Sequence, residues 1–322
     1  MLTLIRSTLN DPLLTITEQV QSLWSDYGAI LRCFSPKLNR SVIVKFIQPP
    51  EAKNRQHPRG WNTQTSHNRK IKSYQIETQF YKTYANKTHS KCAVPQLIAV
   101  DHNDKFTLLV LDDLTALGFD SKDTKGTIEQ VKQGIAWLAQ FHASFMQQPI
   151  NELWTQGGYW HLATRQDEWH SMPKGKLRDN AQTIDKTLQQ AKFTTLLHGD
   201  AKLANLCFNS NTEQVAAVDF QYVGKGAGII DLAYFIGSSL SEDDLYFYHE
   251  ILLNQYLAEL KQALQSKGFN HFAQLEQEYR ELYSFEWADL YRFLLGWDPE
   301  SWKINQYMKD VTNSLLTKLA IN

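Results

Sequence analysis

The feature that most constrains this chain is the stretch LLHGDAKLANLCFNSNTEQVAAVDF at residues 196–220. It carries His198 and Asp200 in an H-x-D pattern, Asn205 five residues after the aspartate, and Asp219 after a short apolar run. An acidic side chain in this pattern can accept the proton of an attacking hydroxyl, while an amide and a second carboxylate hold magnesium on a triphosphate. The stretch therefore predicts phosphoryl transfer from ATP.

Composition bounds the class of protein. The 322 residues suffice for two lobes with a full core, and 43% hydrophobic residues indicate an ordered globular protein. The net charge of -1 gives no global electrostatic case for binding nucleic acid or an anionic membrane. Three scattered cysteines do not suit a disulfide framework or a zinc site.

Targeting signals are not evident in the sequence. The N-terminus has no basic region that leads into a long apolar run, which argues against a signal peptide. No apolar stretch approaches the roughly 18 residues of a membrane span. We expect a cytoplasmic protein without a membrane span, and the sequence leaves its oligomeric state open.

Residues 28–47 have the pattern of a β-hairpin. The β-branched runs GAILRCF and SVIVKFI are joined by SPKLNR, a link rich in turn-forming residues. The second run contains Lys45 within alternating apolar residues. A lysine on a strand ordinarily faces solvent. With the Asp200 stretch in the same chain, we favour a lysine that reaches the α- and β-phosphates of ATP.

Residues 49–73 are polar and basic, and their proline and glycine residues exclude a single long helix until late in the segment. The cationic residues are Lys53, Arg55, Arg59, Arg69, Lys70 and Lys72. We expect a solvated loop. The alternative is a basic flap whose charge offsets the triphosphate. Trp61 suggests that the loop docks on another part of the protein.

The following residues, 74–85, have helical spacing, with Ile76, Phe80 and Tyr84 at four-residue steps. Glu77 lies beside this apolar stripe. A surface glutamate is the simple interpretation. We favour the functional one, in which Glu77 pairs with the strand lysine and holds it on the phosphates.

Two further strands are predicted at residues 96–101 and 106–111. The second runs into Asp112, Asp113 and Leu114. An acidic pair after an apolar strand can be an ordinary exposed strand end. Its position between the lysine strand and the Asp200 loop also suits a hinge between lobes, where backbone groups would bond adenine.

The second half of the chain is predicted to be mostly helical. The predicted helices are 127–146, 181–192, 229–239, 243–267, 272–295 and 301–319. His142 lies on an apolar stripe and is expected to be a satisfied core histidine. Gly224, Gly226 and Gly228 indicate a flexible loop with unusual backbone angles. Asp231 is expected to cap the helix that follows, or to accept backbone hydrogen bonds from the Asp200 loop.

Residues 283–302 are far richer in aromatic side chains than the 12% of the whole chain. Core packing is the first interpretation. The second is an aromatic wall for a small substrate, including a cationic one, with Trp287, Asp289 and Trp297 in contact with it. Glu286 and Asp289 would supply the negative charge that a cation requires.

HGDAKLAN and AVDFQYVGKGAGIIDLAYF resemble the aminoglycoside phosphotransferase and choline kinase superfamily, most closely its ecdysteroid-kinase-like and choline-kinase-like bacterial members. HPRGWNTQTSHNRKIKSYQIE and GGYWHLATRQDEW are similar to stretches of the same branch. The resemblance implies an α+β, two-lobed protein-kinase-like fold. Its N-terminal lobe, residues 1–111, would hold an antiparallel sheet and a helix. A hinge at residues 112–114 would lead into a mostly helical C-terminal lobe at residues 115–322.

The resemblance also implies roles for the residues of the catalytic stretch. Asp200 would be the catalytic base, and Lys202 would lie where some kinases place a lysine on the γ-phosphate. Asn205 and Asp219 would ligate magnesium. His198 would support the loop by hydrogen bonding.

In the N-terminal lobe, the resemblance implies that Lys45 contacts the α- and β-phosphates and that Glu77 orients it. Asp112 and Leu114 would border the adenine. One departure concerns the segment SDYGAIL, where Gly28 stands alone and no glycine-rich phosphate loop is visible. Phosphate binding would then depend more on Lys45, magnesium and the basic segment.

The expected reaction is transfer of the γ-phosphoryl group of ATP, with Mg²⁺ as cofactor, to a small alcohol that is choline-like, aminoglycoside-like or of another kind. A non-catalytic nucleotide-binding regulator and a protein kinase are the alternatives. The intact set Lys45, Asp200, Asn205 and Asp219 argues against the regulator. The lack of an A-P-E-like element after Asp219 favours a small substrate over a protein.

Overall fold

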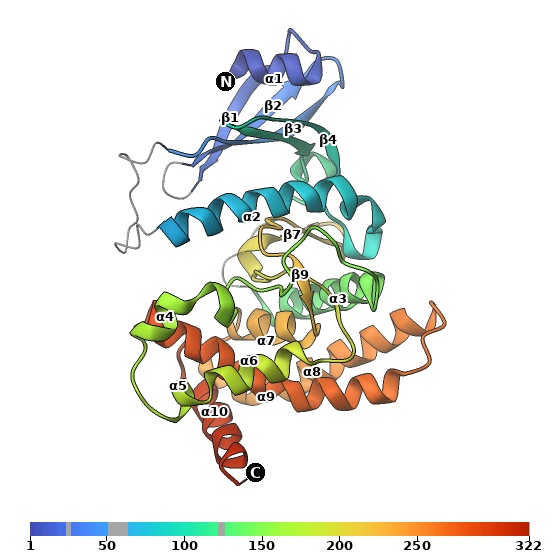
Figure 1. The fold of residues 1–322 in the computed structure, drawn as a ribbon. Coiled ribbons are helices and arrows are strands. Elements are labelled where there is room, and N and C mark those ends of the chain that lie inside the picture. The colour runs from blue at the N-terminus through green and yellow to red at the C-terminus, as the bar shows by residue number, and fades with distance from the viewer. Residues whose placement is uncertain (24–26, 51–63, 122–125, 322) are drawn as a thin grey trace.

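The computed structural model of the protein has two lobes, an upper sheet-containing lobe and a lower helical one (Figure 1). It describes residues 1–23, 27–50, 64–121 and 126–321. The upper lobe contains one five-stranded sheet in the order β1-β2-β3-β5-β4, and all its pairings are antiparallel. The strands are β1 Thr15–Ser22, β2 Gly28–Ser35, β3 Arg40–Ile47, β4 Leu97–His102 and β5 Thr107–Asp112.

The hairpin predicted at residues 28–47 is formed by β2 and β3, which pair from Gly28 with Ile47 to Ser35 with Arg40. One face of the sheet packs on the N-terminal helix α1, Leu2–Leu9, through apolar side chains such as Ile5, Val42 and Val110. Because the residues of a strand point alternately to the two faces and Val44 packs in the cluster with α1, Lys45 leaves the sheet on the opposite face.

Helix α2, Gln64–Thr83, lies between the sheet and the helical lobe (Figure 1). The loop predicted for residues 49–73 is therefore wrong over 64–73, where Arg69, Lys70 and Lys72 are helical. The rest of that basic segment, 51–63, with its predicted docking residue Trp61, lies outside the described residues. The apolar stripe of α2 packs mainly on the lower lobe, where Phe80 stacks on Phe220 at 3.9 Å between ring centroids.

The lower lobe is built from helices around one large apolar core. They are α3 Ile128–Phe145, α4 Gln166–Ser171, α5 Lys176–Asp179, α6 Ala181–Gln189, α7 Ile229–Gly237, α8 Glu242–Gln265, α9 Phe272–Trp297 and α10 Gln306–Leu319. Thr127 starts α3 with a capping box to Gln130. The predicted helices agree closely, except that α10 begins five residues later than expected.

Two short antiparallel pairs frame the catalytic stretch: β6 Thr195–Leu197 with β9 Gly224–Gly226, and β7 Leu206–Phe208 with β8 Val215–Ala217. The glycine-rich segment predicted to be a flexible loop is thus partly a strand. Gly224 and Gly226 are needed for close packing instead, since a Cβ on Gly224 would lie 2.4 Å from the Trp154 carbonyl oxygen.

Short 3₁₀ turns connect several elements: η3 Ala85–Lys87, η4 Ser90–Cys92, η5 Thr115–Leu117, η6 Leu162–Thr164 and η7 Leu203–Asn205. None of the helices in the described ranges has both the length and the apolar character needed to cross a bilayer.

Candidate active site

A cavity of about 720 Å³ lies between the two lobes. Its walls come from the underside of the sheet, from α2, from the strand end at residues 111–115, from the catalytic stretch and from the end of α9. The residues predicted for catalysis, for nucleotide binding and for metal binding all line it: Lys45, Glu77, Asp112, Leu114, Asp200, Lys202, Asn205 and Asp219.

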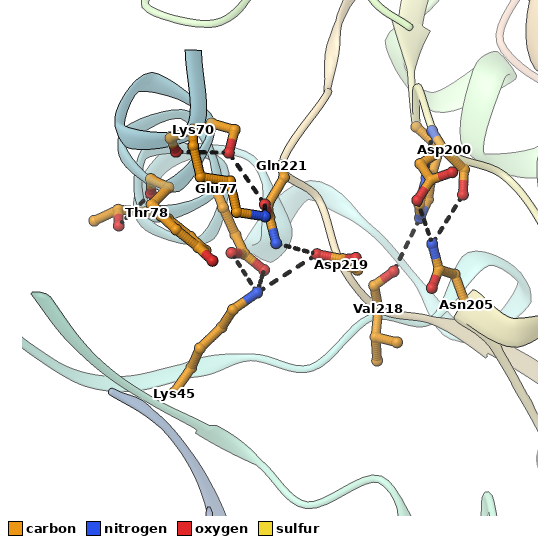
Figure 2. Close-up of polar contacts among 12 residues, drawn as sticks. Lys45, Lys70, Glu77, Thr78, Asp200, Asn205, Val218, Asp219 and Gln221 are labelled. Atoms are coloured by element: carbon orange, nitrogen blue, oxygen red, sulfur yellow. Dashed lines mark hydrogen bonds and ion pairs between the residues drawn. The ribbon is translucent and has the colours of Figure 1, made fainter. Parts of the chain in front are cut away.

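Lys45 and Glu77 form a buried ion pair in this cavity. The Nζ atom donates to both carboxylate oxygens, at 2.9 and 2.7 Å, and the two residues are 5% and 1% exposed. Nζ also lies 3.5 Å from Oδ1 of Asp219 (Figure 2). Burial alone would lower the pKa of Lys45, but Glu77 and Asp219 outweigh it and raise that pKa. Lys45 therefore remains cationic, and its ammonium group is held between Glu77 and Asp219.

Asp200 is held by three side chains. Its Oδ2 accepts from Lys202 Nζ at 2.9 Å and from Asn205 Nδ2 at 3.1 Å, while Oδ1 accepts from the Tyr234 hydroxyl at 3.1 Å. Asn205 Nδ2 also donates to the Asp200 carbonyl oxygen at 2.9 Å. Burial would lower the pKa of Lys202, but the Asp200 carboxylate raises it. These donors fix the carboxylate and leave its orientation defined.

The loop that carries Asp200 rests on Asp231, which is fully buried in the first turn of α7. Asp231 accepts from the backbone N–H of His198 at 2.6 Å and of Gly199 at 2.9 Å. His198 is also fully buried and lies 3.1 Å from the Val218 carbonyl oxygen through Nε2. Burial lowers the pKa of His198, which favours a neutral ring. The ring then supports the loop through its hydrogen bond to Val218.

The prediction that His142 is a satisfied core histidine is confirmed. It is fully buried on α3, with Nδ1 2.8 Å from the Tyr256 hydroxyl and Nε2 3.1 Å from Oδ2 of Asp231. Gly228 must lack a side chain beside it, because a Cβ there would lie 2.3 Å from the Tyr256 hydroxyl oxygen. The catalytic loop is thus supported from the core by a continuous set of hydrogen bonds.

Asp219 has a left-handed backbone, with φ of 71°. Its Oδ1 accepts from Gln221 Nε2 at 2.6 Å and faces Lys45. Burial would raise its pKa, but Lys45, Lys202 and Lys70 lower that pKa to about 2. The side chain is therefore an ionised carboxylate at any physiological pH.

The donor set fits magnesium. Asn205 uses its amide nitrogen toward Asp200, which leaves its amide oxygen as a ligand, and Asp219 uses Oδ1 toward protein donors, which leaves Oδ2. Among the described residues, no group of three or more His, Cys, Asp or Glu side chains could hold a metal by itself. The two oxygens left on Asn205 and Asp219 suit Mg²⁺, which typically takes one or two protein oxygens together with phosphate oxygens.

At the other end of the cavity, Asp112 and Asp113 hold the strand end. Asp112 Oδ2 accepts from the Gln96 N–H at 3.1 Å, and Oδ1 pairs with Arg40 at 3.0 Å. Asp113 was expected to be exposed, but it is 3% exposed and accepts from Arg32 Nε at 2.8 Å. Since both carboxylates are committed to the protein, adenine would be recognised here by backbone groups and by the Leu114 side chain.

The three aromatic-segment residues predicted to contact a substrate separate in space. Trp297, at the end of α9, lines the cavity. Trp287 is fully buried in the core of the lower lobe, where its ring lies 5.0 Å from that of Tyr307. Asp289 is bonded to Arg292 Nε at 2.7 Å in the interior. Periodicity alone cannot tell the two faces of α9 apart, and the structure brings neither Trp287 nor Asp289 to the cavity.

Sequence reasoning missed several residues that line the cavity. Lys70 lies two turns before Glu77 on α2, and burial lowers its pKa to about 8. Tyr234 and Lys303 contact each other beside Asp200, at 3.2 Å between hydroxyl and Nζ. Arg165 is a further residue of this kind that lines the cavity. Only the basic residue count around Lys70 gave a signal in the sequence.

Comparisons with known proteins bear on the family and the fold of the chain. A model of the ecdysteroid kinase-like family matches residues 34–152 and 158–269. An uncharacterized kinase-like protein of Caenorhabditis elegans is 30% identical over 91 residues, which cover 28% of this chain and 24% of that protein. This chain therefore matches only a minor part of that relative's length.

One solved structure shows the same fold. The amicoumacin kinase hAmiN, in complex with AMP-PNP, Ca²⁺ and Ami, aligns with a TM-score of 0.53 at 13% identity, covering 97% of this chain and 93% of that one. An aminoglycoside-3'-phosphotransferase of type VIII aligns with a TM-score of 0.49 at 13% identity, covering 87% and 97%. At these identities the likeness concerns the fold alone.

Proposed function

Since the chain belongs to the ecdysteroid kinase-like family, we propose that it is an ATP- and magnesium-dependent kinase that phosphorylates a hydroxyl group of a small molecule. The observation that carries this proposal is the convergence of Lys45 on β3 with Asp200, Asn205 and Asp219 of the stretch 196–220 on one cavity, from two distant parts of the chain. These side chains provide a phosphate-binding cation, a proton acceptor and two metal ligands.

In the proposed reaction, Asp200 accepts the proton of the acceptor hydroxyl as its oxygen bonds to the γ-phosphorus and the bond from phosphorus to the ADP oxygen breaks. Lys202 and Tyr234 hold the carboxylate toward the cavity through their hydrogen bonds. Lys45 would bind the α- and β-phosphates. Asn205 and Asp219 would hold magnesium, which supplies positive charge against the triphosphate.

We keep three finer assignments as parts of this proposal. The lobes would be residues 1–111 and 115–322, with 112–114 as the adenine hinge. The location would be cytoplasmic. A regulator without activity has no need of a base such as Asp200 held by three donors, which supports an enzyme over that alternative.

The test compares wild-type protein with Asp200→Asn. We measure Mg-ATP binding by calorimetry, and ADP release with a library of alcohols and with generic peptide acceptors. Asp200→Asn is expected to lower transfer at least about a hundredfold, the usual contribution of a general base. Nucleotide affinity should remain within about threefold, since other residues would bind the phosphates.

Asp243→Asn, on the exposed start of α8, is the matched control and should behave as wild type. Equal loss of transfer and of nucleotide binding in Asp200→Asn would argue against its role as base. Transfer to peptides in preference to alcohols would favour the protein-kinase alternative.

A further inference from the structure

The acceptor side of the cavity is the part beyond Asp200 as seen from Lys45. It is bounded by the segment at residues 159–165, by Tyr234 on α7, and by residues 297–303 between α9 and α10. Cationic side chains occupy it, namely Lys303 and Arg165, with Arg69 of α2 beside them. The acidic residues that we expected to serve a cationic acceptor, Glu286 and Asp289, are buried elsewhere.

Lys303 is the cation nearest the catalytic carboxylate. Its Nζ lies 3.2 Å from the Tyr234 hydroxyl, and the same hydroxyl donates to Asp200 Oδ1 at 3.1 Å. Within the described part of the chain, no carboxylate oxygen lies within 4.0 Å of this ammonium. Asp200 is already bonded to Lys202, Asn205 and Tyr234, so it does not act as a direct counterion for Lys303.

The two arginines leave a second excess of positive charge. Arg165 Nη1 lies 3.0 Å from Oε1 of Glu168, and Arg69 Nη2 lies 3.9 Å from the same oxygen. Two guanidinium groups therefore share one carboxylate. Arg165 is 7% exposed and packs over the rings of Tyr159 and Phe293, at 5.7 and 5.2 Å from their centroids.

We propose that the acceptor alcohol carries an anionic group, such as a carboxylate, sulfate or phosphate, which pairs with Lys303 while the hydroxyl faces Asp200. A cationic acceptor would have to lose its hydration shell beside Lys303 and Arg165 without gaining a counterion, which is unfavourable. An anionic group supplies the missing counterion. The rings of Tyr159, Tyr234 and Trp297 would hold the apolar body of the acceptor.

This inference rests on the proposed kinase function only in the statement that the acceptor hydroxyl faces Asp200. Charge selection at Lys303 can be measured as binding, without turnover. The probes are alcohols in matched trios on one-ring, two-ring and four-ring skeletons. The members of each trio share one hydroxymethyl group and differ in a second substituent, which is a carboxylate, a neutral hydroxymethyl or an aminomethyl group.

Dissociation constants are measured by calorimetry with wild-type protein saturated with Mg-AMP-PNP. We expect the carboxylate member of at least one skeleton to bind about tenfold more tightly than the aminomethyl member, the scale of one charge-assisted hydrogen bond. Lys303→Met should remove most of this preference, and Lys303→Arg should retain it. Lys309→Met, a half-buried lysine of α10 outside the cavity, is the matched control and should not change it.

Several results would overturn the proposal. They are tighter binding of the aminomethyl members, no binding of any carboxylate member, and an unchanged preference in Lys303→Met. A loss of Mg-AMP-PNP affinity in Lys303→Met as large as the loss of acceptor affinity would assign this lysine to the triphosphate instead.

The outcomes also separate this inference from the kinase function. If the wild-type protein transfers phosphate only to neutral or aminomethyl alcohols, the kinase function stands and the anionic acceptor is wrong. If carboxylate alcohols bind through Lys303 but no alcohol of any charge is phosphorylated, the charge selection stands and the kinase function fails. A monoanionic sulfate analogue and a largely dianionic phosphate analogue of the best carboxylate then rank the three anionic groups.

Discussion

The two ends of the cavity differ in how their charges are matched. At the nucleotide end, Lys45 is paired with Glu77 and faces Asp219, so the cation has its counterions within the protein. At the acceptor end, Lys303 contacts a tyrosine hydroxyl, and Arg165 shares one carboxylate with Arg69. At the first end Lys45 has its counterions before ligands bind, whereas at the second end Lys303 acquires its counterion from the ligand.

This difference separates general chemistry from selectivity. The triphosphate and magnesium are the same for every kinase of this fold, so their site can be built from a fixed set of paired charges. The acceptor differs between proteins of one fold, and its recognition depends on local side chains such as Lys303. The same kind of substitution should therefore change activity, stability and binding differently at the two ends.

The largest effect is expected at the nucleotide end, for Asp219→Ala. Removal of this ionised carboxylate takes away one of the two proposed metal ligands, so kcat/KM for any acceptor should fall by about a thousandfold. Calorimetry with and without EDTA should show that nucleotide binding no longer depends on magnesium. Asp120→Ala is the control, because Asp120 lines the same cavity but bonds to Ser210. Unchanged magnesium dependence in Asp219→Ala would contradict the metal site.

The contrast in charge pairing predicts a contrast in stability. Lys45→Met leaves the buried Glu77 carboxylate without its cation and should lower the free energy of unfolding by about 3 kcal/mol. The double variant Lys45→Met, Glu77→Gln should recover part of this loss but not nucleotide binding. Lys303→Met breaks no ion pair within the described residues and should cost less than about 1 kcal/mol. Urea unfolding measures the free energy of unfolding of all three variants. Equal losses in Lys45→Met and Lys303→Met would contradict the difference in charge pairing between the two ends.

Tyr234 connects Lys303 at the acceptor end to the carboxylate of Asp200, the proposed base. Tyr234→Phe removes the hydroxyl between Lys303 and Asp200, so kcat should fall about tenfold, the value of one hydrogen bond to a charged group. Mg-ATP affinity should not change. The exposed Tyr246→Phe serves as control. If KM for the nucleotide increases while kcat stays unchanged, Tyr234 takes no part in the transfer step.

The smallest effect concerns pH. Burial lowers the pKa of Lys303 to about 8, while Asp200 opposes this shift and Lys202 adds to it. As pH rises through 8, Lys303 loses its proton and its attraction for an anion. The ratio of kcat/KM for a carboxylate alcohol to that for its neutral partner should then fall about threefold or more between pH 7 and pH 9. In Lys303→Arg the ratio should stay constant, and the same decline there would exclude Lys303 as its cause.

The sequence was sufficient to predict residues that meet in one cavity, because local spacing determines much of their placement. His198, Asp200 and Asn205 lie on one short turn, and the apolar run of β8 brings Asp219 back beside them. Lys45 and Glu77 are far apart in the chain. Alternation and periodicity place each on its own element, but the arrangement in protein kinases is what predicts that the two meet, as they do here. The fold class predicted from these residues is confirmed.

The acceptor end could not be predicted in the same way. Lys303 lies in the irregular segment between α9 and α10, where no periodicity indicates a direction. Trp287 and Trp297 are residues of the same type on the same helix, yet the first packs in the core and the second lines the cavity. Gly224 and Gly226 were misjudged because close packing, rather than backbone angle, requires them. In each case the deciding contact comes from an element distant in sequence.

Helix α2 has a consequence for regulation. In protein kinases the helix that carries the lysine-binding glutamate can be displaced to inactivate the enzyme. Here Phe80 of that helix stacks on Phe220, and Arg69 donates to the Thr164 carbonyl oxygen at 2.7 Å, so both ends of α2 are anchored to the lower lobe. An outward swing would have to unpack that lobe. The arrangement therefore suits a constitutive catalyst, whose output follows the supply of its substrates and not an on–off switch.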